Sequence, residues 1–364
     1  MGCHKGEQPP VQPEEPAATS ASATPPPRAT ASALASASVG ATAPLIPYAD
    51  GQGPSPGGLA AGSVPSPDGG VAASPDGVRP TATGRAMPPT IPPPDPGRLE
   101  LISAGSEPRQ TLRFAPKVGQ VDALSMTMKV GMAASVGDKK VPSGNFPPMM
   151  LKLTLKVAEV TPDGDIAYDF LVTGADAKTK GLPADQARLV QKGVSGLVGL
   201  GGRARVTGTG ITRDVVIKPP KGGSAQLAPV MQSMEQAMNE VLAPLPEEAV
   251  GKGAKWKFVR TARQSGVLVT QTATYELLGV KPGKIKLGVE LEQTAPRQAI
   301  RAPNGARLEL MALQAKGTGK RILRLVHLSP QRSAVAISSR TQMAIPDQGV
   351  MTIDTSISID MTGR

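Results

Sequence analysis

From about residue 110 onward, apolar and polar side chains alternate one by one, and this period-two pattern limits the fold more than any other feature of the chain. Residues 124–132 carry Leu, Met and Val at every second position, with Ser, Thr, Lys and Gly between them. Residues 151–157, 166–172, 285–291 and 353–361 show the same habit. Because successive side chains of a strand point to opposite faces, such segments predict strands with one apolar and one solvated face. One-sided strands are typical of an antiparallel sheet.

Two segments break the alternation and are predicted to be helices. Between Gln226 and Ala243, Leu, Val and Met recur at spacings of three and four, and Pro244 ends the pattern. The segment from Ala184 to about Leu200 begins in the same way and then becomes rich in glycine. The expected fold class is therefore α+β and mainly β, with a large curved antiparallel sheet packed by one or two helices.

The first 97 residues have a different composition. They hold 21 of the 38 prolines and few large apolar side chains, so they cannot bury enough surface to offset the entropy of ordering. We predict a disordered tether over residues 1–97 and a β-rich domain over residues 98–364. An alternative is that the tail is a terminus without a function, which composition alone leaves open.

Three short matches between turn segments indicate an internal duplication of about residues 110–218 and 245–361. The matches keep their order along the chain. They pair residues 118–120 with 250–252, 160–164 with 280–283, and 208–210 with 317–319. Short Gly and Pro matches also arise between unrelated turns, so this interpretation stays open.

Cys3 is the single cysteine of the chain, and it follows Met1-Gly2 at the head of the tail. Bacterial lipoprotein signals end in a small residue before a Cys that becomes the lipidated N-terminus, so these residues match the end of a truncated or missing signal peptide. Lipid on Cys3 would anchor the protein to a membrane. The alternative is an incidental thiol. Without lipidation, the protein would be secreted or its location would stay open.

The charge is concentrated in the domain. The chain carries +11, but the tail has four basic and seven acidic residues, which leaves +14 on residues 98–364. A basic domain favours anionic partners such as lipid headgroups or envelope polymers. The alternative is that Lys and Arg solvate the polar faces of strands. With one Trp, two Tyr and four Phe, the domain lacks the stacking aromatics of single-stranded nucleic acid binding, so nucleic acid is not an expected partner.

Residues that could carry catalysis are few. His327 is the one histidine of the domain, and its apolar neighbours favour a surface or packing role on a strand. The closest acidic pairs are Glu247-Glu248 and Glu290/Glu292, and the second pair alternates with apolar residues as a solvated strand face would. We predict no catalytic residues, no metal ligands and no cofactor, and hence a protein that is not an enzyme. A hydrolase whose site uses Arg or Lys with Ser or Asp and no His stays open as an alternative.

Methionine is the residue type that most favours a binding role. Twelve of the 14 methionines fall in the domain, and Met side chains adapt to irregular apolar surfaces such as a cavity for acyl chains. The candidate apolar ligand contacts are Met126, Met128, Met132, Met231, Met234 and Met238. The alternative is that a core short of aromatic residues is filled with Met.

Residues Leu112–Gln120, Leu245–Trp256 and Thr274–Leu277 resemble a family of uncharacterised bacterial lipoproteins and secreted proteins that is classed only as a domain of unknown function. The resemblance covers most of residues 110–360. It implies export and a β-rich fold, and it brings no catalytic residues. The chain has Ala254 after Gly253 where the family pattern leads us to expect an acidic residue.

These observations predict a non-enzymatic, lipoprotein-like domain in the bacterial cell envelope that binds an apolar or anionic component, with lipid as the first choice. The alternative is a structural or assembly partner that docks an envelope protein or polymer through its basic face.

Overall fold

The computed structural model describes residues 1–2, 95–220, 231, 234–235, 237–264, 267–301, 307–345 and 349–364. Cys3 and nearly all of the predicted tether lie outside the described residues. The first described strand, β1 (Asp95–Ser103), begins within the last residues of the predicted tail and was not expected from the sequence. Its partly buried Leu99 and Leu101 pack against the hydrophobic core.

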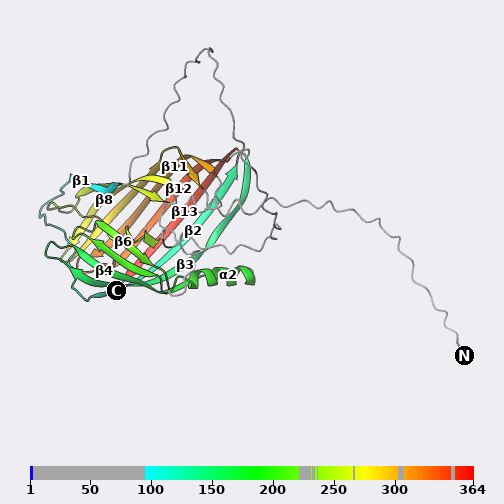
Figure 1. Ribbon diagram of the computed structural model, residues 1–364, viewed down its shortest axis with the longest axis horizontal. Helices are drawn as coiled ribbons and strands as arrows, with labels where there is room; N and C mark the ends of the chain where they lie inside the picture. The colour runs from blue at the N-terminus through cyan, green and yellow to red at the C-terminus, as the bar shows by residue number, and fades with distance from the viewer. Residues whose placement is uncertain are drawn as a thin grey trace, which may run out of the picture.

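Antiparallel pairing dominates, as predicted, and joins all strands into one sheet. The strands after β1 are β2 (Val121–Val136), β3 (Lys139–Val160), β4 (Ile166–Ala177), β5 (Gly201–Val206), β6 (Thr212–Lys218), β7 (Lys255–Gln264), β8 (Val267–Lys281), β9 (Lys284–Ala295), β10 (Gln298–Arg301), β11 (Arg307–Arg324), β12 (Arg332–Ile345) and β13 (Gly349–Gly363). Their order is β1-β7-β8-β9-β11-β12-β13-β2-β3-β4-β5-β6, with β10 paired to β11. Figure 1 shows this sheet bending round, with β4 and β6 in front of the strands from β8 to β13.

The predicted alternation places one side chain in two on the inner, concave face of the sheet. In β2 the burial pattern alternates strictly from Asp122 to Val130, and β9 and β13 behave in the same way. Two glycines of β11 lie in phase with this inner face. A Cβ at Gly317 would come within 2.9 Å of the Ile337 side chain, and one at Gly319 within 2.6 Å of the Ala334 carbonyl oxygen. Glycine at these two positions therefore lets neighbouring strands approach closely where the sheet bends.

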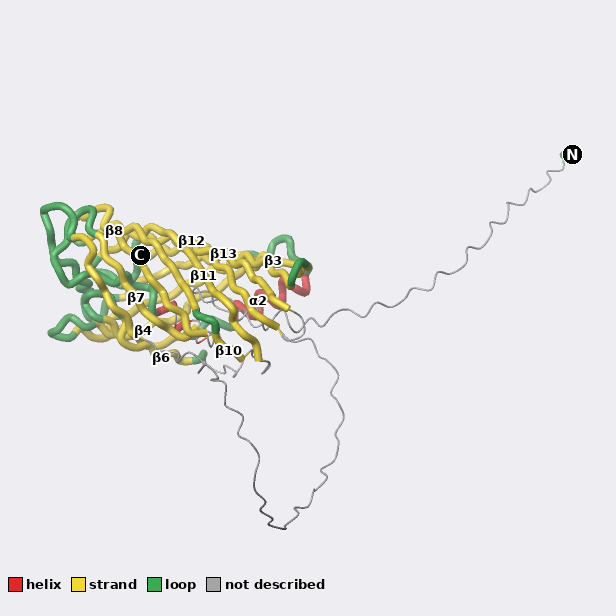
Figure 2. Tube along the Cα trace, turned by 90° about the horizontal axis from the view of Figure 1, so that it is seen from above, coloured by secondary structure: helices red, strands yellow, loops and turns green. Residues whose placement is uncertain are grey.

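Connecting segments gather at one end of the sheet, where Figure 2 shows most of the loops. The segment after β1 crosses this end. Its Phe114 N–H donates to the Gly208 carbonyl (2.8 Å) in the turn between β5 and β6, while Gln110 pairs with Val250 ahead of β7. The same segment thus contacts both halves of the sheet, which lie far apart in strand order, and covers the core at this end.

Helical structure was predicted correctly in part. The described helix α2 (Ala184–Ser195) matches the first part of the predicted segment 184–200 and packs on β4. In the predicted helix 226–243, residues 231, 234–235 and 237–238 are helical, whereas Asn239 and Glu240 form a turn. The helix end at Ala243 was wrong, because the chain turns across the concave face five residues earlier. Among the described residues, no helix is long and apolar enough to cross a membrane.

The three sequence matches behind the predicted duplication fall in different settings. In the first match, Gly119 has φ of 81° and its N–H donates to the Val157 carbonyl at 2.9 Å, whereas the matched Gly251 has no positive φ and its N–H donates to the Ala104 carbonyl at 2.9 Å. Residues 208–210 lie in the turn between β5 and β6, whereas residues 317–319 lie inside β11. The duplication stays a prediction, and the first and third matches do not support it.

Candidate functional site

A pocket opens on the concave face, beneath the chain that follows the helical residues 237–238. Residues Ala237 to Pro244, the covering segment, form one wall, and inward side chains of β2, β7, β8, β9, β11, β12 and β13 form the other. Residues of β7 and β2 line the same pocket although five strands separate them in the sheet. The curvature of the sheet therefore creates this site. The cavity volume is about 70 Å³, room for roughly two waters at about 30 Å³ each.

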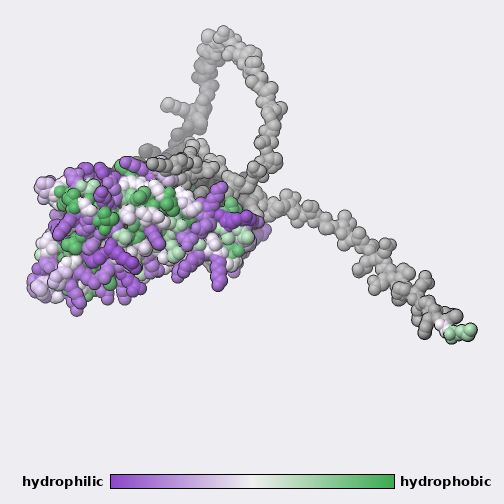
Figure 3. All heavy atoms as spheres, turned by 90° about the horizontal axis from the view of Figure 1, so that it is seen from below, coloured by the Kyte–Doolittle hydropathy of each residue, from purple (hydrophilic) through white to green (hydrophobic). Residues whose placement is uncertain are grey.

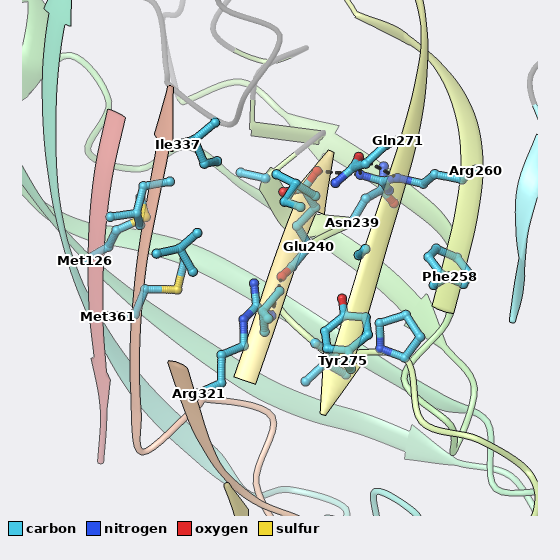
Figure 4. A pocket seen from close by; sticks show the side chains of 18 residues that line it. Met126, Asn239, Glu240, Phe258, Arg260, Gln271, Tyr275, Arg321, Ile337 and Met361 are labelled. Carbon is cyan, nitrogen blue, oxygen red and sulfur yellow. Dashed lines mark hydrogen bonds and ion pairs between the residues drawn. The ribbon is translucent and has the colours of Figure 1, made fainter. Parts of the chain in front are cut away.

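One side of the pocket is apolar. Met126 of β2 and Met361 of β13 face each other across paired strands, and Figure 4 shows them together on this side. Ile337, Ile359 and Leu242 complete it. These side chains come from the alternating strands and the covering segment, and two of the five are flexible thioethers. Such a wall can change shape at little cost.

The other side is polar. The guanidinium of Arg260, on β7, pairs with the Glu240 carboxylate and donates to Gln271 Oε1 at 2.8 and 3.0 Å. The side chains of Arg260 and Glu240 are 14% and 21% exposed. This ion pair therefore lies largely out of water, where it holds the covering segment to the sheet.

Arg321 of β11 reaches the pocket between these two sides (Figure 4). Its Nη1 donates to the main-chain oxygen of Glu240 at 3.2 Å, and not to the carboxylate. Its Nε is buried and has no hydrogen-bond partner among the described residues. Tyr275 lies beside it; burial raises the pKa of the Tyr275 hydroxyl, and the positive charge of Arg321 acts in the opposite direction. The ring of Tyr275 stacks on Trp256 with centroids 5.8 Å apart.

A row of polar residues continues from the pocket across the concave face. Strand register places Arg260 opposite Gln271 and Gln271 opposite Gln293, and after Ala315 of β11 the row resumes with Ser339 and Thr355. Gln271, Gln293 and Thr355 are buried. The apolar side chains on the two sides of this row belong to separate hydrophobic clusters. The inner face is thus divided by a polar belt, and the polar side of the pocket, with Arg260, lies at the β7 end of this belt.

Of the six methionines predicted as ligand contacts, Met126 lines the pocket. Met128, Met234 and Met238 are buried in the main cluster, and Met231 packs against it partly buried. Met132 packs against the second cluster instead. The structure therefore brings five of the six together from β2 and the segment 231–238, in positions that serve packing as well as they would serve a ligand.

A second polar cluster lies at the loop-covered end and fastens the start of β2 to the turn between β11 and β12. Asp122 accepts hydrogen bonds from His327 Nδ1 (2.7 Å), from the Gln120 amide (2.9 Å) and from the N–H groups of Leu328 (2.7 Å) and Ser329 (3.1 Å). Burial raises the pKa of Asp122, but these hydrogen bonds outweigh it and hold the pKa below its usual value.

His327 itself lies in that turn and not on a strand, which corrects the predicted placement. In the part of the chain that the structure describes, no hydroxyl group hydrogen-bonds to His327, and the buried Ser329 Oγ has no partner. The arrangement is that of a clamp between two segments, with the imidazole proton directed at the carboxylate.

The acidic pairs considered from the sequence lie apart from the pocket and from the Asp122 cluster. Glu247 and Glu248 are exposed in the segment before β7. Glu292 lies on the outer face of β9 and pairs with Lys316 at 3.8 Å. Within the described ranges, no three His, Cys, Asp or Glu side chains lie close enough together to hold a metal ion.

Sequence reasoning missed Arg260, Arg321 and Glu240. For the two arginines a signal was present: Arg260 falls in phase with Trp256 and Phe258, and Arg321 with Leu323, so each puts a charge at an inward position of its strand. A cation in the apolar phase of an alternating strand indicates a buried partner or a site. No such signal was present for Glu240, because the helical pattern predicted for this segment places Glu240 on the solvent-exposed face.

Comparisons with known proteins add little. No protein-family model and no curated protein matches this chain. The solved structures that overlap with it weakly include two of the outer membrane protein OmpT of Vibrio cholerae: a loop L8 deletion mutant (TM-score 0.21) and an in-vitro folded trimer form (TM-score 0.16). Each is 8% identical and covers 68% of this chain and 100% of the other. Overlaps at these scores bear on neither the fold nor the function.

Proposed function

We propose that this protein is an envelope-anchored, non-enzymatic binding protein whose ligand is an apolar or anionic envelope component, with a lipid as first choice. The observation that carries the proposal is the pocket on the concave face. It combines a deformable apolar side containing Met126 and Met361 with a polar side containing Arg260, and Arg321 lies between the two. Ligand pockets of proteins are typically concave and largely apolar, with a few placed polar groups.

The proposed anchor is a lipid on Cys3. The residues Met1-Gly2-Cys3 and the Pro/Ala/Ser-rich tail after them support it, because such a tail of about ninety residues would hold the domain roughly 50–60 Å from a membrane. Expression from the natural locus with an alkyne-tagged palmitate tests this part. The label should enter the wild-type chain and be lost in Cys3→Ser, whereas equal labelling of both would contradict it.

Pocket binding is tested with the apolar fluorophore N-phenyl-1-naphthylamine and the full-length chain. Ala237 lines the pocket, so Ala237→Phe should fill it and weaken the probe's affinity by roughly tenfold or more. The matched control is Ala336→Phe, which adds the same ring on the exposed outer side of β12. Native mass spectrometry of protein from its own host would show whether a lipid accompanies the wild type. Absence of probe binding, or equal binding by the two variants, would remove the proposal.

The second candidate function is docking of an envelope protein or polymer through the basic outer face. The domain charge of +14 favours it. This net charge remains after every acidic residue is counted, although some basic side chains are paired locally: Arg340 with Asp354, Arg203 with Asp169 and Lys255 with Glu276. Figure 3 shows hydrophilic side chains spread over one side of the surface, with smaller apolar areas between them. Pull-down of a partner whose affinity falls with salt would favour this function.

A further inference from the structure

The charges at the pocket do not balance. Two guanidinium groups, of Arg260 and Arg321, and one carboxylate, of Glu240, line it. Glu240 is engaged by Arg260, which also holds Gln271. Arg321 contacts only the main-chain oxygen of Glu240 among the hydrogen bonds formed by the described residues. One positive charge at the pocket therefore has no carboxylate in direct contact.

A charge in this position is costly unless something offsets it. The Nε of Arg321 is buried and unpartnered among the described residues, so its N–H has lost water without gaining an acceptor. A guanidinium is suited to two parallel hydrogen bonds with one carboxylate or phosphate group. An oxyanion would supply both the acceptors and the negative charge that Arg321 lacks.

We propose that the pocket binds the headgroup of an anionic amphiphile, with a carboxylate or phosphate oxygen held by Arg321. This inference rests on the proposed function and narrows its ligand to a chemical class. The cavity of about 70 Å³ matches a headgroup and its first methylene groups. Arg260 and Gln271 contribute a second polar edge, and the polar belt beyond them continues the hydrogen-bonding surface.

The apolar part of the ligand would extend from Arg321 toward Met126 and Met361. Both are unbranched side chains of paired strands, and rotation of their thioethers widens the cavity without moving the backbone. Arg321, Met361 and Met126 therefore define a direction: the oxyanion lies at β11 and the alkyl chain points toward β13 and β2.

Calorimetric titration of the full-length chain with octyl phosphate, octanoate and 1-octanol tests the inference. The three share one alkyl tail and differ in the headgroup, so the comparison isolates the oxyanion. Wild-type protein should bind the better of the two anions at least about tenfold more tightly than octanol, as expected for charge-assisted hydrogen bonds. A preference for phosphate over carboxylate, or the reverse, distinguishes the two sources of the headgroup.

The variants are Arg321→Gln, Arg321→Lys and the control Arg340→Gln. Arg321→Gln should abolish the anion preference while octanol affinity is retained, and Arg321→Lys should keep a reduced preference, because the charge remains and the fork is lost. Arg340→Gln removes an equal charge from the exposed outer face and should leave the preference intact. The Tm of ligand-free Arg321→Gln should equal or exceed that of the wild type, which shows that the variant is folded.

The outcomes separate the two levels of the proposal. If octanol and the anions bind wild type equally, or if Arg321→Gln keeps the preference, the headgroup assignment is wrong while apolar binding stands. If none of the three ligands binds and N-phenyl-1-naphthylamine also fails to bind, both the assignment and the proposed function are wrong. An anion preference that disappears only in the Arg321 variants supports the assignment.

Discussion

The ion pairs of the concave face and those of the outer face use the same residue types in opposite surroundings. Arg260 and Glu240 are 14% and 21% exposed, whereas Arg340 and Asp354 are 66% and 48% exposed. The inner pair fastens the segment over the pocket to the sheet, and the outer pair joins two strands that thirteen register positions already join. The inner pairs therefore determine the shape of the site, while the outer pairs keep one face of the sheet in water.

The largest loss of folding stability is expected for a change at Asp122, whose side chain is 2% exposed. Asp122→Ala leaves the N–H groups of Leu328 and Ser329 and the imidazole of His327 without their acceptor, so it should lower the free energy of unfolding by about 3–5 kcal/mol. Urea unfolding measures this. The matched control, Asp354→Ala on the outer face, should change it by no more than about 0.5 kcal/mol. Equal losses would show that burial does not separate the two classes.

The next effect is expected at Glu240. Glu240→Gln leaves Arg260 in a largely buried position without its counter-charge, so the free energy of unfolding should fall by about 2–3 kcal/mol. The double variant Glu240→Gln with Arg260→Gln should recover part of that loss, since it removes both charges. A double-mutant cycle without coupling would show that the pair does not hold the covering segment.

Part of this arrangement follows from sequence, and the reason is local. Alternation is a property of neighbouring residues, so the strands over 121–136, 284–295 and 349–363 could be predicted, as could the start of α2. β1 was missed because its first residues include Pro96 and Gly97, which are unfavourable in strands, and its alternation is limited to Leu99 and Leu101. The pocket could not be predicted, because it depends on which strands the curved sheet brings together.

The helix end illustrates the same limit. Apolar residues continue at helical spacing as far as Leu242, yet the chain turns at Asn239 and Glu240. Beyond that turn, Val241 and Leu242 are buried in the main cluster and Glu240 meets Arg260, so tertiary contacts override local periodicity. The pairing of Glu240 with Arg260 joins positions that local patterns treat as independent.

A smaller effect concerns pH. The folded-state pKa of Asp122 is lowered, because its hydrogen bonds outweigh the effect of burial. Its ionised form therefore contributes stability above the unfolded pKa of about 3.9, and this contribution is lost as the pH falls through the lower folded value. Between pH 6 and 2, the unfolding free energy of Asp122→Asn should fall less steeply than that of the wild type. Parallel profiles for the two proteins would contradict this assignment.

The smallest expected effect is on the outer face. Arg340 donates to Asp354 at 2.7 and 3.3 Å, but both side chains are about half or more exposed, so water and salt screen the pair. Arg340→Gln should change the free energy of unfolding by about 0.5 kcal/mol or less, and the change should shrink further in 1 M NaCl. Glu240→Gln should keep most of its effect at the same salt concentration, because its partner is shielded by the sheet. A salt response of equal size at both sites would mean that water reaches the concave face as freely as the outer one, and the polar wall of the pocket would then lose the low-dielectric setting on which selective headgroup binding depends.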